Sequence, residues 1–266
     1  MTRIPEIVPP LPRAHTLGRD LPASAAFDWL YAGWRDLKAR PGLSLSYGLA
    51  VFIASLAVIA GLFALALDYV LFPALAGFMV VGPALAIGLY EKSRRIAAGE
   101  PVTLPDMIIV RPRSGSQILF TGLLLCLLLL VWMRAAVLLY ALFFGLLPFS
   151  GLGAVAGTMF TTPLGGALMV VGGLVGGVFA AFSFAISAFS VPMLLDERTD
   201  ALTAMGTSMA LVWNNLNVML TWGAIVAGLF ALCVATGLAA LIVIFPLLGH
   251  GTWHAYVAVC RGSRTT

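Results

Sequence analysis

The sequence predicts an all-α polytopic membrane protein with six transmembrane helices, arranged as three hairpins with short amphipathic helices at the membrane interface. Hydrophobic residues make up 61% of the 266 residues and charged residues only 10%, whereas a soluble domain carries about a quarter charged residues. Residues 70–90 contain no charge, and Glu91, Lys92, Arg94 and Arg95 then follow almost together. A run of this length suits a crossing of about 30 Å of hydrocarbon. We therefore expect one membrane domain over residues 23–260.

The first 22 residues differ from this domain, because four prolines lie between residues 5 and 12. Proline fixes φ and removes a backbone donor, so we expect an extended arm rather than a helix. Two interpretations stay open. The arm is either a free tail or a docking strand, whose anchors would then be Ile4, Val8 and Leu11.

Residues 24–40 show apolar side chains at helical spacing and include Trp29 and Trp34. An apolar face with tryptophans and basic flanks is typical of a helix that lies in the membrane interface. The alternative is a helix that caps the cytoplasmic side of the bundle. Both tryptophans are also candidates for contact with a partner protein.

The spans follow in order. We expect the first two at 43–67 and 70–90, the third from residue 117 to Arg134 with an apolar continuation to 147, and the fourth within 164–195. Residues 216–259 are too long for one crossing at about 1.5 Å per residue and should form two spans. Between the spans, segments 104–110 and 199–215 are further amphipathic candidates, 148–163 is a charge-free loop, and 261–266 is a tail.

This span count places 14 of the 15 lysines and arginines on one side, which the positive-inside rule assigns to the cytoplasm. Both termini then lie in the cytoplasm. Arg134 is the exception, and Asp68 should lie at the same depth near the outer boundary. We predict that Asp68 and Arg134 form a structural pair, with separate contacts to the interface as the alternative.

An amphipathic segment followed by two spans recurs three times, in residues 24–91, 104–198 and 203–260, which predicts three hairpins around a pseudo-threefold axis. The fourth span contains Gly172, Gly173, Gly176 and Gly177. Small residues four positions apart let helices approach closely in lipid. These glycines therefore predict helix packing, either within the monomer or in a homo-oligomer.

His250 and His254 are the candidates for cofactor chemistry, because their spacing puts them on one face of the sixth span. A zinc or haem site needs more ligands than these two, and His15 is the remaining histidine. We therefore expect hydrogen-bonding histidines, with no catalytic, cofactor or metal site. The formal charge of +4 gives no reason to expect nucleic acid.

Three runs in the sequence are FDWLYAGWRDLKARPGLSLSYGL, GPALAIGLYEKSRR and SVPMLLDER. They resemble a bacterial integral membrane family, domain of unknown function 2189 (DUF2189), and the resemblance covers nearly everything after residue 24. It implies a bacterial inner membrane protein without an established activity. Some members are labelled cytochrome c oxidase subunit I, but haem–copper centres need about six histidines and this chain has three.

Three functional hypotheses follow. The first is a non-catalytic accessory, assembly or scaffold subunit of a larger membrane complex, such as a respiratory, cytochrome oxidase-associated one. Its partners would be membrane lipids and other integral membrane subunits. The alternative is a small-solute transporter or channel lined by the second spans, which Pro83, Pro192 and Pro246 should interrupt. The third is haem or metal handling through His250 and His254.

Overall fold

The computed structural model describes residues 17–145 and 152–261, apart from the side chains of residue 68 and residues 152–156. The described part is helical and contains no strand. Six of its helical segments are long and apolar enough to cross a membrane: Pro41–Ala64, Leu71–Ala97, Gly115–Phe144, Pro163–Asp196, Leu216–Ala235 and Leu241–Arg261. The all-α class and the six spans are therefore confirmed.

The amphipathic helix α1 (Ala25–Lys38) and the first span α2 (Pro41–Ala64) are separate helices. Between them Arg40 has a positive φ of 61°, a left-handed conformation that ends the helical path. Pro41 then begins α2, where its fixed φ suits a first helical turn and its missing N–H costs no hydrogen bond. A short 3-10 helix, η1 (Asp68–Val70), leads into the next span.

Two of the three second spans are interrupted. In one, α3 (Leu71–Leu85) gives way to α4 (Ile87–Ala97) at Ala86, shortly after Pro83. In the other, α8 (Pro163–Ser187) gives way to α9 (Ser190–Asp196), which contains Pro192. The last span, α12 (Leu241–Tyr256), stays continuous around Pro246 and passes into the π-helix η2 (Val257–Arg261). The expected break at Pro246 is therefore wrong.

The remaining helices are α5 (Leu104–Ile108), α6 (Gly115–Phe144), α7 (Leu152–Thr161), α10 (Ala201–Asn214) and α11 (Leu216–Ala235). Helix α6 continues through Arg134 for 30 residues, roughly 45 Å at helical rise. Helix α7 occupies most of the segment that we expected to be a loop. It packs against α8, which explains why this apolar stretch becomes helical.

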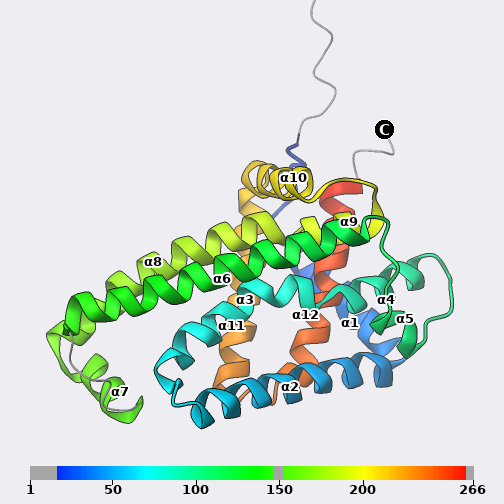
Figure 1. The fold of residues 1–266 in the computed structure, drawn as a ribbon. Coiled ribbons are helices and arrows are strands. Elements are labelled where there is room, and N and C mark those ends of the chain that lie inside the picture. Colours follow the sequence, from blue (N-terminus) through cyan, green and yellow to red (C-terminus); the bar gives the residue numbers. More distant parts are fainter. Residues whose placement is uncertain (1–16, 146–151, 262–266) are drawn as a thin grey trace, which may run out of the picture.

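Helix α12 is the centre of the molecule. In the most apolar stretch of the last span, 56% of the residues are buried inside the protein. The corresponding share in the other five spans is 6–22%. Helices α1, α2 and α4 pack against it (Figure 1). Glycines make these contacts close, because a Cβ on Gly33 would lie 2.6 Å from the Gly251 nitrogen, and a Cβ on Gly48 would overlap the Ile242 carbonyl.

The glycines of the fourth span differ in their surroundings. Among the described residues, a Cβ added to Gly172, Gly173 or Gly177 would meet no neighbouring atom within 4 Å, whereas one on Gly176 would face the Trp132 ring of α6 at 2.9 Å. Helix α8 packs against α6 and α3. The role of the four glycines in helix packing, within the monomer or in a homo-oligomer, stays a prediction.

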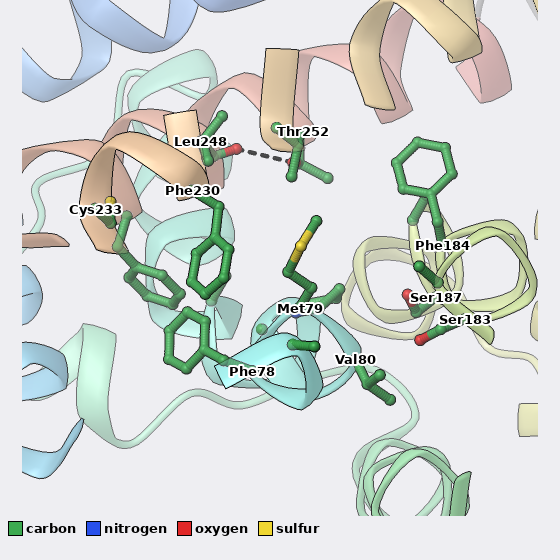
Figure 2. Close-up of a pocket in the computed structure, with 18 of the residues that line it drawn as sticks. Phe78, Met79, Val80, Ser183, Phe184, Ser187, Phe230, Cys233, Leu248 and Thr252 are labelled. Carbon is green, nitrogen blue, oxygen red and sulfur yellow. Dashed lines mark hydrogen bonds between the residues drawn. The ribbon is translucent and has the colours of Figure 1, made fainter. Parts of the chain in front are cut away.

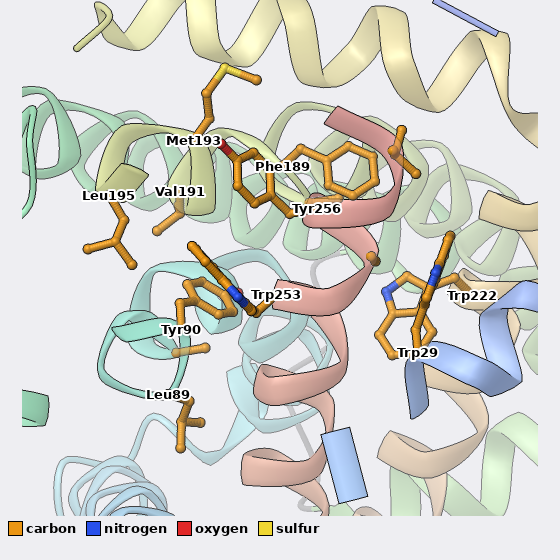
Figure 3. Packing of buried hydrophobic residues seen from close by; sticks show 14 of the residues in the cluster. Trp29, Leu89, Tyr90, Phe189, Val191, Met193, Leu195, Trp222, Trp253 and Tyr256 are labelled. Atoms are coloured by element: carbon orange, nitrogen blue, oxygen red, sulfur yellow. The ribbon is translucent and has the colours of Figure 1, made fainter. Parts of the chain in front are cut away.

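Helix α1 presents two different faces. Its inner face carries Trp29, which is 5% exposed and meets the Trp222 ring edge-to-face at 5.9 Å, within a core that also holds Trp253 and Tyr256 (Figure 3). Trp34 is 39% exposed on the outer face. Trp29 therefore packs inside the chain, and of the two tryptophans expected to dock a partner, Trp34 stays accessible.

The first two spans do not pack as a closed hairpin. Helix α2 packs against α12, whereas α3 packs against α6 and α8, and a groove of about 760 Å³ lies between α2 and α3. In contrast, α6 and α8 lie side by side (Figure 1). The order of amphipathic helix, span and span recurs in the three predicted units, and their threefold symmetry stays a prediction.

Candidate functional site

Six polar side chains from four helices form a connected series beside α12, which we call the polar chain. Lys92 (α4), Ser44 (α2), His250 (α12) and Ser93 (α4) are joined by hydrogen bonds, as are Asp36 (α1) and His254 (α12), and Ser93 connects the two groups through its electrostatic effect on Asp36. Four of them are at most 1% exposed: Lys92, Ser44, His250 and Ser93. Buried polar groups of this kind are costly unless they are paired, so the direction of each bond matters.

In the first half of the polar chain, the hydrogen bonds are all donated in one direction, from Lys92 towards Ser93. The Lys92 ammonium, which can only donate, bonds Ser44 Oγ at 2.7 Å and the Arg40 carbonyl at 3.3 Å. Ser44 is then left with its own hydrogen to donate to His250 Nε2, 2.9 Å away. A neutral imidazole that accepts at Nε2 carries its proton on Nδ1, and this N–H donates to Ser93 Oγ at 2.8 Å.

The second half ends on a carboxylate. His254 Nε2 lies 2.8 Å from Asp36 Oδ2, and the Ser93 hydroxyl also stabilises the Asp36 carboxylate. Burial raises the pKa of Asp36, but the hydrogen bonds from His254 and Ser93 outweigh it and hold the pKa below the usual 3.8. Asp36 is therefore ionised at neutral pH. The polar chain thus connects a buried ammonium to a carboxylate through neutral groups.

This arrangement is suited to holding helices together. Removing one member of a buried charged network leaves an uncompensated group, which is strongly destabilising. The polar chain joins α1, α2, α4 and α12, and its serines and His250 are closed off from solvent. Ser44 and His250 each accept one bond and donate one, so this part of the series could also pass a proton between neighbours.

The structure places His250 and His254 on the same side of α12, as their spacing suggested, and gives each a hydrogen-bond partner. Both ring nitrogens of His250 are occupied by serine hydroxyls. Glu91 on α4 is held by Arg94 and Arg95 at 2.8 and 2.7 Å. Within residues 17–145 and 152–261, no group of three or more His, Cys, Asp or Glu side chains could hold a metal ion.

Ion pairs also lie on either side of the polar chain, at the same end of the molecule. Arg95 also reaches Asp106 at 3.1 Å, which ties α5 to α4. On the other side, Arg261 forms a two-pronged pair with Asp196, and the Tyr256 hydroxyl donates to the same carboxylate at 3.0 Å. These ion pairs therefore fix α5 and α9 in place.

Sequence reasoning missed four members of the polar chain: Asp36, Ser44, Lys92 and Ser93. No local pattern marks them, because Ser44 and His250 are 206 residues apart and Ser93 and His250 are 157 apart. One available signal was the sixth span itself. Its mean hydropathy of 1.3 is the lowest of the six, as expected of a helix surrounded by protein rather than lipid.

Two predicted sets of residues lie outside the part that the structure describes. Ile4, Val8 and Leu11, the proposed anchors of the arm, are not among the described residues. The Asp68 side chain is not described either. The docking arm and the Asp68–Arg134 pair therefore stay predictions.

Comparison with known proteins gives one match. Residues 71–196, just under half of the chain, match the family model described as "Predicted integral membrane protein (DUF2189)". The matched region runs from α3 to α9, and it confirms the resemblance found in the sequence motifs. No curated protein and no solved structure matches. The chain is thus an integral membrane protein similar to a family of unknown function.

Proposed function

Starting from this family match, we propose that the protein is a non-catalytic accessory or scaffold subunit that holds other integral membrane proteins. The observation behind the proposal is the groove between α2 and α3, which we call the α2–α3 groove. Its volume is about 760 Å³. Consecutive spans joined by a short turn would normally pack together, so an open groove between them favours an added helix.

The α2 wall of this groove carries small residues at a fixed spacing. Ser46, Ala50 and Ala54 recur every four residues, are exposed and line the groove. Helices in lipid gain little from burying apolar surface against each other, and they associate where small residues let their backbones approach closely. A partner's transmembrane helix therefore suits this wall better than flexible acyl chains do.

The proposal includes a location and a candidate complex. We place the protein in the bacterial inner membrane with both termini in the cytoplasm, as the charge distribution and the family resemblance suggest. The respiratory, cytochrome oxidase-associated complex suggested by that resemblance is the first partner to look for. A homo-oligomer built through the same groove is the second.

Purification from native membranes tests the proposal. The tagged full-length protein, extracted in mild detergent, should bring down a discrete partner in constant ratio. Ala50→Leu and Ala54→Leu place bulk on the groove wall and should lose that partner. Ala60→Leu is the matched control, because Ala60 is exposed on α2 without lining the groove. A partner retained by both groove variants, or no partner with the wild type, would contradict the proposal.

The arm gives a second, separate test of partner binding. Removing residues 1–16 spares Leu17 and Arg19, which are bonded to Asn215. If Ile4, Val8 and Leu11 are docking anchors, the truncated protein should insert normally and yield less partner. An unchanged partner yield would leave the arm without a docking role.

A transporter or channel is the second candidate, favoured by a smaller cavity of about 370 Å³. All three second spans line this cavity, including Ala86 and Ala188 at the two helix interruptions. Interrupted helices line substrate sites in many transporters. Efflux of small solutes from proteoliposomes tests this function. A rate equal to that of protein-free liposomes across neutral, anionic and cationic solutes would reject it.

A further inference from the structure

The smaller cavity lies between α3, α8, α11 and α12, and we call it the serine cavity because Ser183 and Ser187 form part of its wall (Figure 2). Apolar and aromatic side chains such as Phe78, Phe184 and Phe230 supply most of its lining. That lining contains no charged side chain. A volume of about 370 Å³ is within the range of small-molecule sites.

The two serines carry unused hydrogen-bonding capacity. Ser183 and Ser187 are 2% and 1% exposed, and neither hydroxyl has a hydrogen-bond partner among the described residues. A serine inside a helix can donate to the carbonyl four residues earlier, as Ser55 does to Val51 at 2.8 Å. An unpaired buried hydroxyl lowers the stability of the fold. Two of them on one face of α8 therefore favour a bound group that accepts their hydrogen bonds.

The position of these hydroxyls distinguishes them from others in the chain. Within the described part of the chain, Thr121 and Ser190 also have no hydrogen-bond partner but do not line the serine cavity, so an unpaired hydroxyl alone marks no site. Thr252 does line the cavity, and its hydroxyl already donates to the Leu248 carbonyl at 2.8 Å (Figure 2). The cavity-lining hydroxyls without a hydrogen-bond partner are therefore those of Ser183 and Ser187 on α8.

The glycines of α8 give the cavity its room. Gly172, Gly173 and Gly176 line it, and a Cβ on Gly172 or Gly173 would meet no neighbouring atom. Leucine at these positions would fill space that the fold leaves open. The glycine-rich face thus leaves space for a guest in the cavity.

We propose that the serine cavity binds an uncharged lipophile through a carbonyl oxygen that accepts hydrogen bonds from Ser183 and Ser187. Because the lining carries no charge, the guest must be uncharged. The aromatic walls favour a molecule that is mostly apolar. The two serine hydroxyls have no acceptor, so they favour a guest with a carbonyl oxygen. This chemistry has two sources in a membrane: the ester of a lipid and the ring of a quinone. The proposal needs neither the partner subunit nor transport.

Tryptophan fluorescence gives a direct test, because Trp132 and Trp222 line the cavity. The full-length protein in detergent is titrated with a quinone bearing a decyl chain and, separately, with a diester lipid whose acyl chains are brominated. Saturable quenching by the first identifies a quinone site, and by the second a lipid site. Ser183→Ala combined with Ser187→Ala should weaken the effective probe about tenfold. No saturable quenching by either probe, or unchanged affinity in the double variant, overturns the proposal.

Matched controls separate binding from folding. Ser55→Ala also removes a serine hydroxyl from a span but lies outside the cavity, so its affinity should equal that of the wild type. Gly173→Leu should abolish binding, whereas Gly177→Leu, on the same helix but not in the lining, should not. The ligand-free double serine variant should be at least as heat-stable as the wild type. If it melts earlier and still binds the probe normally, the serines are structural and the proposal fails.

Discussion

Replacing Ser44 with alanine should cut the polar chain at its first link. The hydroxyl accepts from Lys92 Nζ at 2.7 Å and bonds His250 Nε2 at 2.9 Å. Its loss leaves the buried ammonium with the Arg40 carbonyl at 3.3 Å and the imidazole nitrogen without a donor. A hydrogen bond to a charged group contributes about 1.5–3 kcal/mol and a neutral one about 0.5–1.5. We therefore expect a loss of about 2–4 kcal/mol.

Thermal unfolding in detergent measures this loss, with Ser46→Ala as the matched control. Ser46 lies on the same helix, but it is exposed and its hydroxyl bonds the nearby Leu43 carbonyl. For a chain of this size the midpoint should fall by roughly 5–10 °C in Ser44→Ala and change little in Ser46→Ala.

A second change tests the cause of the loss. Adding Lys92→Met to Ser44→Ala removes the unpaired ammonium and should recover part of the stability. Equal midpoints for Ser44→Ala and Ser46→Ala would refute the conclusion that the polar chain holds these helices together.

Three further outcomes are expected. Gly48→Ala should lower the same midpoint because its Cβ overlaps the α12 backbone, whereas Gly42→Ala, with open space around it, should be near neutral. The pKa of Asp36 is lower in the folded state than its usual 3.8, so its stabilising effect is complete above about pH 4 and is lost as the pH falls further. Acid titration should therefore show less loss of stability below that pH in Asp36→Asn than in the wild type. A reporter active only outside the cytoplasm should give signal when fused after Gly237 and none after Gly99, and the reverse pattern would contradict the proposed orientation.

The spans could be predicted because each depends on its own residues. The first was expected at 43–67 and is Pro41–Ala64, since a helix that crosses lipid must be apolar over a fixed length. Prolines also marked real interruptions beside Ala86 and within the α8–α9 region. Pro246 did not break its helix, because a helix enclosed by neighbours on several sides tolerates one missing donor.

The polar chain could not be predicted because it depends on which helix lies at the centre. Lys92 belongs to a run of charges that ends a span, and that pattern indicates a solvated lysine rather than a buried one. Its burial requires that α2 and α12 both lie close to α4, and hydropathy does not encode that arrangement. The open groove beside α3 has the same origin, since a hairpin was the simplest packing of two adjacent spans.

The order in which the chain is made gives the central position of α12 a further consequence. Synthesis proceeds from the N-terminus, so α1, α2 and α4 leave the ribosome well before the helix that joins them. The partners of the polar chain are as much as 218 residues apart. Before α12 is synthesised, no imidazole lies between Asp36 and Lys92. Helix α1 also lacks the helix against which it mainly packs. A chain that stops early therefore keeps an unbridged lysine and a first helix without its main packing partner. The first span, α2, is therefore stabilised by packing only after the last span, α12, has been synthesised.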